Sequence, residues 1–426
     1  MLTTRPRGTN DLLPEELDKW HYVESILHQV AALYGYQEIR TPIFEHTELF
    51  QRGVGENTDI VEKEMYTFLD RGERLLTLRP EATASTVRAF LEHKLYAGSL
   101  PVKLYYIGPM FRYDRPQAGR YRQFHQFGVE VFGAQDPSLD AEVIAMAMDI
   151  YQRLGLRNLV VELNSVGCPS CRKAHRQVLH EYLKEQLSDL CPTCQGRFER
   201  NPLRILDCKN ERCQGLVANA PTIDAMLCEE CRHHFQLVQE YLQELQVTYT
   251  LNPKLVRGLD YYTKTAFEIV AQGIGAQSSI GGGGRYDHLI EEIGGPSLPG
   301  IGYAMGIERI ILTLEEQGIE FPHTAKSQVF IATLGDTAHK KGAKIAQDLR
   351  KAGLVVEQDY LGKGLKAQLK AANRLQVQTA VIIGEEELAK GEAVVRKMLE
   401  GSQEVVSLNE LVPYLVKENK GGKQDE

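Results

Sequence analysis

The sequence predicts an α+β domain with a mainly antiparallel sheet, a small inserted domain and a separate C-terminal α/β domain. Strand-like segments follow one another in hairpin order, which favours antiparallel pairing. All eight cysteines lie between Cys168 and Cys231, in a stretch that interrupts this strand pattern. From Ser327 onward strands and helices alternate, as in a parallel or mixed sheet. We therefore expect a first domain over 1–325, interrupted by an insertion at 168–245, an α/β domain over 327–416 and a disordered tail at 417–426.

The composition is that of a globular protein. The chain has 426 residues, a formal net charge of -8 and 43% hydrophobic residues. It has no apolar run near the ~20 residues that span a bilayer and no apolar signal segment at its start. We therefore expect a cytoplasmic protein with no membrane contact. The negative charge argues against broad, nonspecific DNA binding, although local basic patches can still hold a nucleic acid.

The first elements follow from periodicity and helix-breaking residues. Residues 15–34 have apolar side chains at helical spacing between Pro14 and Gly35, which predicts a helix. Residues 39–50 read as an extended segment whose proline favours an edge or interface strand. Two short strands at 66–70 and 75–80 flank a polar turn, and a helix begins near Glu81.

A long hairpin comes next, with strands at 103–114 and 122–133 joined by the loop Arg115–Tyr121. Asp136-Pro137 predicts the start of a helix that stops at Gly155. Further strands of the same sheet are expected at 159–164, 247–252, 264–271 and 276–281. The C-terminal series is expected as strand 329–334, helix 337–352, strand 354–360, helix 365–375 and strand 379–384.

The hairpin is rich in arginine and aromatic residues. Arg112, Arg115, Arg120 and Arg122 alternate with tyrosines and phenylalanines over 111–133. Guanidinium groups suit phosphates and carboxylates, and aromatic rings suit base stacking. Strand alternation puts Gln126 and Glu130 on one face, where they can hold an amine. The alternative is a solvated, salt-bridged hairpin.

Two further segments carry candidate binding residues. Glu81 and Thr83 open a helix, where they either form an ordinary helix start or line a pocket whose carboxylate receives an ammonium group. Arg257 precedes a glycine and the pair Tyr261 and Tyr262, which face opposite sides if the segment is extended. These tyrosines either pack in a core or form the walls of an aromatic pocket.

The glycines at 281–284 follow a strand-like segment and precede a helix. They form either a flexible linker or a stretch where a ligand lies against the backbone. Gly302 and Gly306 lead into a helix that carries Arg309, a combination suited to polyphosphate. The sequence has no Walker A pattern and no GxGxxG after a parallel strand, which excludes those two nucleotide-binding modes.

The cysteines are candidates for structural zinc sites. They form four pairs in the sequence, of which three have CxxC spacing and the fourth has a longer spacing. Eight thiolates can serve two tetrahedral zinc sites. The alternative is reduced thiols without a metal. The residues are Cys168, Cys171, Cys191, Cys194, Cys208, Cys213, Cys228 and Cys231.

Nearly the whole chain resembles the bacterial histidyl-tRNA synthetase family, whose members are class II aminoacyl-tRNA synthetases. IRTPIFEHTELF resembles motif 1 of the class, FRYDRPQAGRYRQFHQ motif 2 and PGIGYAMGIERIIL motif 3. RGLDYYTKTAFEI and SIGGGGRYDHLI resemble two histidine-specific peptides that other class II members lack. The resemblance implies a class II antiparallel sheet, a homodimer formed partly through motif 1 and a C-terminal anticodon-binding domain.

The resemblance also implies roles for individual residues. Histidine would be bound by Glu81, Ala82, Thr83, Gln126, Glu130, Arg257, Tyr261 and Tyr262. ATP, with Mg²⁺, would be bound by Arg112, Arg120 and Arg309, and the catalytic arginines would be Arg112 and Arg257. Arg115 and Gln117 would contact the tRNA. The insertion would lie near the tRNA acceptor stem, and its cysteines are not part of the family's catalytic pattern.

The implied reaction is the ATP-dependent transfer of L-histidine to the 3′-terminal adenosine of tRNA(His). Two rival hypotheses remain. A regulatory, non-enzymatic paralogue is expected to lose the arginines and the last domain, and this chain keeps both. A zinc-ribbon nucleic-acid-binding protein explains the insertion but leaves the arginine and glycine motifs unaccounted for.

Overall fold

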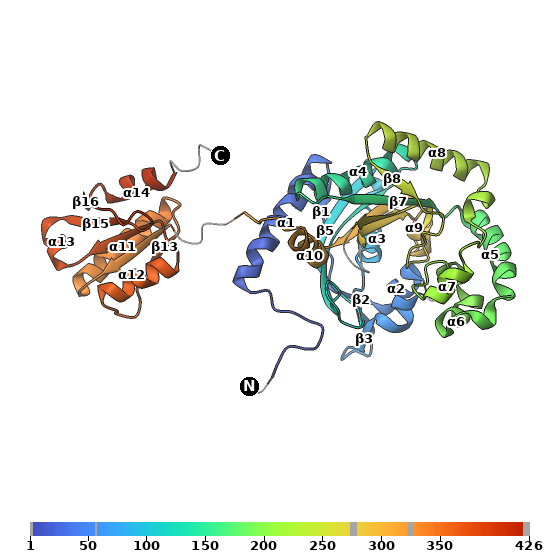
Figure 1. Cartoon of the computed structure of the whole chain (residues 1–426), viewed down its shortest axis with the longest axis horizontal. Helices are drawn as coiled ribbons and strands as arrows, with labels where there is room; N and C mark the ends of the chain where they lie inside the picture. Colours follow the sequence, from blue (N-terminus) through green and yellow to red (C-terminus); the bar gives the residue numbers. More distant parts are fainter. Residues whose placement is uncertain (1–2, 56–57, 273–278, 323–327, 421–426) are drawn as a thin grey trace. The chain divides into compact units, whose positions relative to one another are not determined.

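The chain divides into two compact units, Met1–Phe321 and Pro322–Glu426 (Figure 1). This computed structural model describes residues 3–55, 58–272, 279–322 and 328–420. None of the helices within those ranges is long and apolar enough to cross a membrane.

The first unit is built on an eight-stranded sheet. The strand order is β1 (Gln37–Glu38), β5 (Val102–Phe111), β6 (Gln123–Phe132), β11 (Gly300–Gly306), β10 (Ser279–Arg285), β9 (Thr263–Ala271), β7 (Leu159–Ser165) and β8 (Tyr249–Leu251). All neighbouring pairs are antiparallel except the two outermost pairs, β1–β5 and β7–β8. The predicted mixed, mainly antiparallel sheet is therefore confirmed. Residues 276–278 of one predicted strand lie outside the described residues.

The two faces of this sheet have different coverings. Helices α1 (Pro14–Leu33), α4 (Pro137–Arg153) and α10 (Ile307–Glu316) pack on one face, and α3 (Thr83–Glu92) and α9 (Leu289–Glu292) pack on the other. On β6, Phe127 and Val129 enter the core under α1 and α4. Gln126 and Glu130 therefore point to the opposite face, because side chains alternate along a strand. Asp136 caps α4 as its sequence predicts, accepting the Ser138 amide at 2.9 Å.

A smaller sheet has the order β2 (Phe44–His46), β4 (Leu75–Leu78) and β3 (Tyr66–Leu69). Strand β2 lies at its edge, as the proline before it predicts. The extended segment predicted over 39–50 is wrong in its second half, because helix α2 covers Thr47–Val54. Phe50 and Val54 lie one turn apart on α2 and pack against Ala84 of α3, so burial of a helical face decides the local structure. A short π-helix, η1 (Ile60–Glu64), follows.

The insertion lies between β7 and β8 and is helical. It contains α5 (Pro169–Lys184), α6 (Pro192–Arg200), α7 (Glu211–Leu216) and α8 (Glu229–Glu244). Short 3₁₀ turns are η3 (Leu187–Asp189), η4 (Pro202–Ile205) and η5 (Ile223–Met226) here, with η2 (Leu95–Ala97) after α3. Leu179, Phe198 and Ile205 form part of a core of its own. Helix α8 is shared, because Val238 and Leu242 belong to the main core beside α4.

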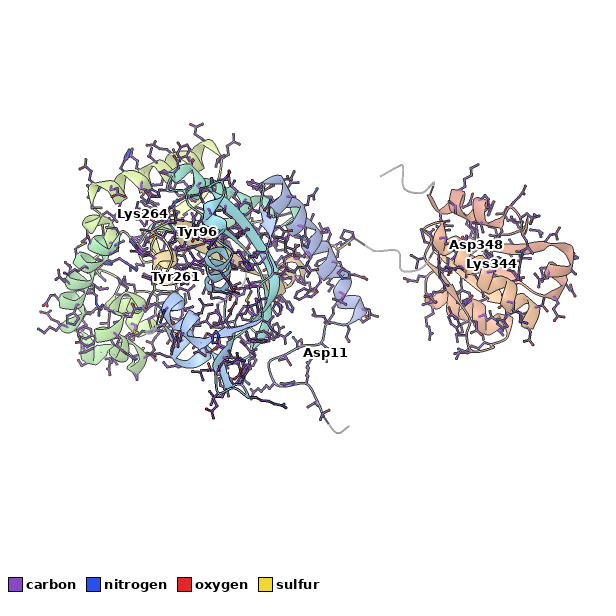
Figure 2. The ribbon with its side chains drawn as sticks, turned by 180° about the vertical axis from the view of Figure 1, so that it is seen from behind. Asp11, Tyr96, Tyr261, Lys264, Lys344 and Asp348 are labelled. Carbon is purple, nitrogen blue, oxygen red and sulfur yellow. The ribbon has the colours of Figure 1, made fainter. Side chains whose placement is uncertain are left out.

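The second unit has a five-stranded mixed sheet. Its order is β13 (Val356–Gln358), β12 (Val329–Thr333), β14 (Thr379–Ile383), β15 (Glu392–Lys397) and β16 (Gln403–Ser407). The first three strands are parallel and the last two antiparallel. Its helices are α11 (Asp336–Lys351), α12 (Leu365–Arg374), α13 (Glu385–Lys390) and α14 (Leu411–Lys420). On α11, Lys344 pairs with Asp348 one turn on, at 2.6 Å (Figure 2).

The predicted tail is partly wrong. Helix α14 runs to Lys420, so residues 417–420 are helical rather than disordered. Leu411 and Leu415 are fully buried one turn apart and fix the helix on the sheet. In the last turn of the helix, the Asn419 side-chain amide donates to the Leu415 carbonyl at 2.8 Å. Residues 421–426 lie outside the described residues.

Candidate active site

A cavity of about 180 Å³ opens on the sheet face opposite α1 and α4. Residues from segments that are far apart in the sequence meet there. The polar and aromatic lining residues are Glu81, Thr83, Tyr106, Arg112, Gln126, Glu130, Arg257, Tyr261, Tyr262, Tyr286 and Tyr303. The structure thus brings together the predicted amino-acid-binding residues, except Ala82, which is buried as the N-cap of α3. Its carbonyl accepts the Thr86 hydroxyl at 2.8 Å.

The floor of the cavity is main chain. Gly128, Ala304 and Gly282 lie opposite one another on β6, β11 and β10, and Gly302 pairs with Glu130 in the next row. The glycines at 281–284 are neither a linker nor a loop, because all four lie within β10. A side chain at Gly282 would meet Arg257 Nη1 at 2.9 Å, so glycine there leaves room for that guanidinium.

Glu81 forms part of the helix start and part of the pocket at once. Its two carboxylate oxygens accept the Thr83 and Ala84 amides, each at 2.8 Å. It therefore satisfies the first free N–H groups of α3. Burial raises its pKa, and these amide bonds oppose the increase. The helix-start interpretation is therefore confirmed. The same buried carboxylate lines the cavity, and its binding of an ammonium group stays a prediction.

Glu130 is the most deeply buried acid in the cavity, with 1% of its surface exposed. Three hydroxyl groups surround it: Thr83 donates at 2.7 Å, Tyr106 at 3.2 Å, and Tyr286 donates to its other oxygen. None of these donors carries a charge. Burial therefore raises the pKa of Glu130 to about 8, although the hydroxyl bonds oppose this. A ligand that brings a donor or a positive charge would favour the ionised form.

Tyr261 and Tyr262 do not face opposite sides, because residues 258–261 form a turn rather than a strand. Their rings lie 4.7 Å apart between centroids, and Tyr261 also meets the edge of Tyr286 at 5.5 Å. Both tyrosines line the cavity. They therefore form one aromatic wall, as the pocket interpretation predicts.

Three lining residues have a buried polar atom that lacks a hydrogen-bond partner among the described residues. The Tyr303 hydroxyl is one, but its side chain belongs to the core on the other face of the sheet. The other two are Gln126 Oε1, an acceptor, and Arg257 Nε, a donor. Buried polar groups are normally satisfied, so an unpaired acceptor and donor in one cavity indicate a ligand with both an ammonium and a carboxylate or phosphate. Arg257 Nη1 also pairs with Glu268 at 3.0 Å, which holds the guanidinium in place.

Arg112 follows β5 and lines the same cavity. Its Nε donates to the Pro80 carbonyl at 2.8 Å, and its guanidinium lies 5.3 Å from the centre of the Phe124 ring. These contacts fix its direction. Burial lowers its pKa, and the carboxylates of Glu64 and Glu81 oppose that change.

Arg120 and Arg309 lie outside the cavity lining. Arg309 Nη1 donates to the carbonyl of Ser279, the first residue of the strand that bears the glycines, at 2.6 Å. Arg120 is paired with Asp114 at the end of the hairpin. Burial lowers the pKa of Arg309, and the nearby charge of Arg120 lowers it further. Two neighbouring guanidiniums suit a ligand that carries several negative charges.

Arg115 and Gln117 are exposed on the hairpin loop. Gln117 exchanges backbone hydrogen bonds with Arg120, at 3.1 and 2.9 Å. The loop packs beside the N-terminal segment, and together they line a hollow that contains Arg5, Arg7 and Gln117. The loop thus presents an open cationic surface away from the cavity.

The eight cysteines form two groups within the insertion. Cys168, Cys171, Cys228 and Cys231 form one, and Cys191, Cys194, Cys208 and Cys213 form the other. In each group all sulfur atoms lie within 4.8 Å of one another. None of these cysteines forms a disulfide. The spacing alone left this grouping open.

Sequence reasoning missed Tyr106 and Tyr286 as site residues. Both hydroxyls bond to Glu130. Tyr106 lies two residues from Leu104, so strand alternation puts both side chains on the same face of β5. Its position directly opposite Gly128 depends on the strand register, which the sequence alone does not give. Tyr286 directly follows Arg285, the last residue of the glycine-rich strand.

Family comparisons agree with this geometry. The model of the family described as histidyl-tRNA synthetase matches residues 8–310, and one described as an anticodon-binding domain matches 328–418. A histidine–tRNA ligase of Desulforamulus reducens is 65% identical over 97% of this chain and 99% of that protein. One of Moorella thermoacetica is 60% identical over 99% of this chain and 100% of that protein.

A solved structure extends the comparison to three dimensions. The apo histidyl-tRNA synthetase of S. aureus superimposes with a TM-score of 0.84 and 43% identity, over 98% of this chain and 100% of that one. Fold, cavity and sequence therefore lead to one conclusion: the chain belongs to the histidyl-tRNA synthetase family of class II aminoacyl-tRNA synthetases.

Proposed function

We propose that this chain is a histidine–tRNA ligase that makes histidyl-adenylate from L-histidine and ATP and transfers the histidyl group to tRNA(His). One observation carries the assignment of the site. Gln126 Oε1 and Arg257 Nε are a buried acceptor and a buried donor in one cavity, and among the described residues neither has a partner. Histidine supplies the ammonium and the carboxylate that would satisfy them.

In the first step a carboxylate oxygen of histidine attacks the α-phosphorus of ATP. A bond from that oxygen to phosphorus forms, the bond to the bridging oxygen breaks, and pyrophosphate leaves. Arg112 and Arg257 line the cavity and stabilise the charge on the α-phosphate. Arg309 and Arg120 lie beside it and hold the phosphates that leave. The protein positions the reactants and forms no covalent intermediate with them.

In the second step the ribose hydroxyl of the terminal adenosine attacks the histidyl carbonyl, and AMP leaves. Arg115 and Gln117, on the exposed loop, would contact the tRNA end. The hollow with Arg5 and Arg7 gives this loop a cationic neighbour for the RNA backbone. The anticodon would be read by the second unit, which matches the anticodon-binding family model.

Mg²⁺ enters this scheme with ATP. Apart from the two cysteine groups, the described residues contain no cluster of three or more metal-ligating side chains. That pattern fits Mg²⁺, which binds mainly to substrate phosphates and water with one or two carboxylates. We assign Glu268 as the carboxylate, because it pairs at 3.0 Å with Arg257, which lines the cavity. The ion would neutralise charge on the leaving phosphates.

Specificity for histidine would come from Glu130 and Tyr262. A buried acceptor that pairs with an imidazole N–H is left unsatisfied by other side chains of similar size, which makes their binding costly. Glu130 supports this role because its three partners in the protein are neutral hydroxyl groups. Glu81 and Gln126 would receive the ammonium.

We also propose that the enzyme is a cytoplasmic homodimer. The three-stranded sheet exposes a group of large apolar side chains next to motif 1, which suits a buried interface between copies. Exposed fractions are 43% for Ile43, 49% for Phe44, 43% for Phe68, 64% for Leu69 and 47% for Leu75.

The deciding experiment is ATP–pyrophosphate exchange with each amino acid in turn. Exchange with histidine alone is the expected result, and exchange with a different amino acid would refute the specificity. A regulatory paralogue that binds histidine would give no exchange with any amino acid.

The role of Arg257 is tested in the same assay. Arg257→Ala should abolish exchange, since it removes transition-state charge stabilisation worth about 100-fold or more, while the circular dichroism spectrum stays unchanged. Arg257→Lys keeps the charge but loses the planar donor and should recover little activity. Near-normal exchange in Arg257→Ala would show that the arginine has another role.

A further inference from the structure

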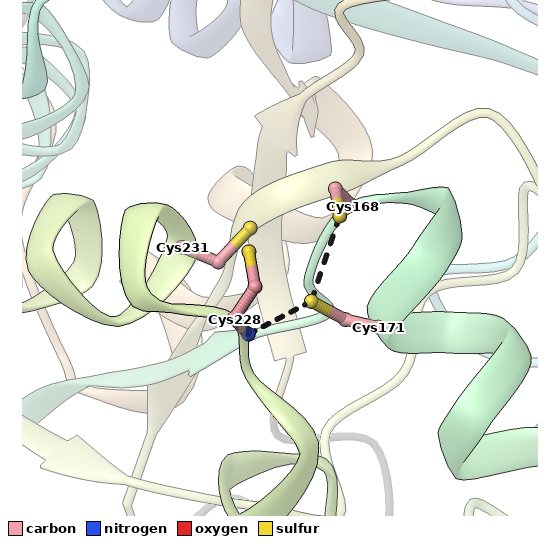
Figure 3. A group of neighbouring side chains, drawn as sticks. All are labelled: Cys168, Cys171, Cys228 and Cys231. Carbon is pink, nitrogen blue, oxygen red and sulfur yellow. Dashed lines mark hydrogen bonds between the residues drawn. The ribbon is translucent and has the colours of Figure 1, made fainter.

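We propose that the two cysteine groups are two structural zinc sites, and that the one nearer the sheet holds the histidine-binding loop in position. Cys168, Cys171, Cys228 and Cys231 form the proximal site, and Cys191, Cys194, Cys208 and Cys213 form the distal site. Figure 3 shows the four proximal side chains converging from the start of α5 and the start of α8.

The sulfur spacing fits a tetrahedral ion. Zn–S bonds of about 2.3 Å at tetrahedral angles place the sulfur atoms ~3.8 Å apart. Cys168 and Cys171 have their sulfurs 3.5 Å apart, and Cys191 and Cys208 have theirs 3.9 Å apart. Four thiolates leave no position for water or substrate, so each site would be structural rather than catalytic.

Backbone amides support thiolate ligands in both groups. The Cys228 amide donates to Cys171 Sγ at 3.1 Å, and the Cys191 amide donates to Cys213 Sγ at 3.2 Å. In each case the two partners come from different CxxC or CxxxxC segments. Hydrogen bonds to sulfur orient metal ligands and stabilise their charged form.

The N-termini of three helices also stabilise the thiolate form of these cysteines. Cys168, Cys191 and Cys228 are the N-cap residues of α5, α6 and α8, and the second cysteine of each CxxC pair lies in the first turn. The partial positive charge at a helix N-terminus stabilises a thiolate. Three helices are thus aligned with their positive ends on the two groups, which a set of unligated thiols does not require.

The distal site would stabilise the insertion itself. Cys194 and Cys213 are fully buried in its small core, beside Phe198 and Leu190. Asn210 caps α7 by accepting the Arg212 amide at 3.0 Å, which fixes the start of the helix that carries Cys213. A helical segment with so small a core gains much of its stability from a bound metal.

The proximal site lies where the insertion joins the sheet. Gly167, with φ +65°, turns the chain from β7 into Cys168, and its carbonyl accepts the Lys264 amide at 2.9 Å. Lys264 Nζ also pairs with Glu230, inside the Cys228–Cys231 pair, at 2.8 Å. Lys264 follows Tyr262 by two residues. The site therefore connects α5, α8 and the start of β9.

Helix α5 also holds the loop directly. Arg172, next to Cys171, donates to the Asp260 carbonyl at 2.9 Å. Asp260 precedes the tyrosine pair that forms the aromatic wall of the cavity. If the proximal ion is lost, the start of α5 is no longer joined to the start of α8, although α8 remains packed in the main core, and the connections to this loop loosen. This consequence rests on the proposed histidine site, whereas the metal sites themselves do not.

Metal content is the first test, and it needs no enzymatic activity. The full chain, purified without chelators from zinc-supplemented cells, should contain two zinc ions per chain by mass spectrometry. Cys171→Ser and Cys194→Ser should each lose one ion, and the double variant both. The matched controls Ser170→Ala and Thr193→Ala, which lie inside the same CxxC pairs, should keep two.

Wild-type measurements keep the proposal falsifiable if a variant fails to fold. Cobalt-substituted protein should show the visible absorption bands of tetrahedral cobalt thiolates. Titration with an organic mercurial, which binds each cysteine sulfur in place of the metal, should release two zinc ions as all eight sulfurs react. Protein without zinc, with its thiols freely titratable, would overturn the proposal. Iron in place of zinc would overturn the choice of metal.

Kinetics tests the positioning role of the proximal site. Cys171→Ser should raise the KM for histidine in pyrophosphate exchange about tenfold with a smaller change in kcat, because the loop is displaced while Arg112 stays in place. Cys194→Ser should leave that KM close to the Thr193→Ala value. Equal effects at the two sites would refute the positioning role, and no exchange in the wild type would refute the proposed function instead.

Discussion

Two buried carboxylates in the same domain have opposite surroundings. Asp140 on α4 is fully buried and meets the guanidinium of Arg285, with Nε–Oδ distances of 3.1 and 3.2 Å. His234 and Thr265 complete its shell at 2.9 and 2.6 Å. Glu130, on the other face of the sheet, meets three hydroxyl groups and no cation.

The pKa values move in opposite directions for this reason. Burial is the largest single influence on the pKa of Asp140 and would raise it, but the charge of Arg285 and the hydrogen bonds from His234 and Arg285 together bring the pKa below its ordinary value. Burial raises the pKa of Glu130 to about 8, and no charge compensates. A compensated buried charge belongs to the permanent structure, while an uncompensated one is suited to a ligand. The comparison separates an anchor of the fold from a part of the binding site.

The largest expected effect is on the anchor. Asp140→Asn removes one of the two carboxylates that pair with the buried Arg285 and leaves Asp287, at 3.2 Å. The loss of that counter-charge should lower the free energy of unfolding by about 3 kcal/mol. Urea denaturation followed by circular dichroism measures this. Asp149→Asn, on the exposed side of the same helix, is the matched control and should change stability little. If Asp140→Asn lowered the free energy of unfolding by less than about 1 kcal/mol, Asp140 would not be an anchor of the fold.

The second effect concerns activity rather than stability. Glu130→Gln should lower kcat/KM for histidine in pyrophosphate exchange about 100-fold or more, because it removes the negative charge and replaces one accepting oxygen by an NH₂ donor. The KM for ATP should change little, and the protein should stay folded. Unaltered histidine kinetics would mean that Glu130 is only a core residue.

The pH dependence of stability follows from the raised pKa. Glu130 is protonated in both states below its ordinary value of 4.5, and its favourable contribution is lost as the pH rises through about 8. The wild type should therefore lose stability relative to Glu130→Gln between these values, by roughly 1.4 kcal/mol per pH unit at most. Urea titrations at several pH values test this, and parallel curves for the two proteins would contradict it.

The smallest effect tests one hydroxyl of the Glu130 shell. Thr83→Val keeps the shape but removes the donor at 2.7 Å, and should raise the KM for histidine by about three- to tenfold. Thr86→Val, one turn further along α3, removes a hydroxyl that donates to the Ala82 carbonyl at 2.8 Å and serves as the control. Equal KM values in the two variants would show that the Thr83 hydroxyl does not tune Glu130.

Local patterns predicted most of the fold. The hairpin of β5 and β6, the capped start of α4 and the alternation of the C-terminal unit all depend on neighbouring residues, and the structure confirms them. Errors occurred where distant packing decides. Residues 47–50 are helical because Phe50 packs on α3, and the glycines at 281–284 form a strand because β9 and β11 pair with them on both sides.

Motifs were enough to propose most residues of the candidate site, but not its geometry. Glu81, Gln126 and Glu130 could be named from the sequence, while the hydroxyls of Tyr106 and Tyr286 depend on strand register. The common wall of Tyr261 and Tyr262 depends on a turn that no local signal required. The grouping of the cysteines depends on how α5 and α8 meet, which spacing cannot determine.

The glycine floor limits how substrate choice can change over evolution. Gly128, Gly282 and Gly302 have no side chain to shorten, so no substitution there deepens the cavity. Each added side chain would instead collide with Tyr106, Arg257 or Glu130 respectively. Mutational drift at the floor can thus lead only to smaller substrates or to loss of binding. Acceptance of an amino acid larger than histidine would have to come from the aromatic wall.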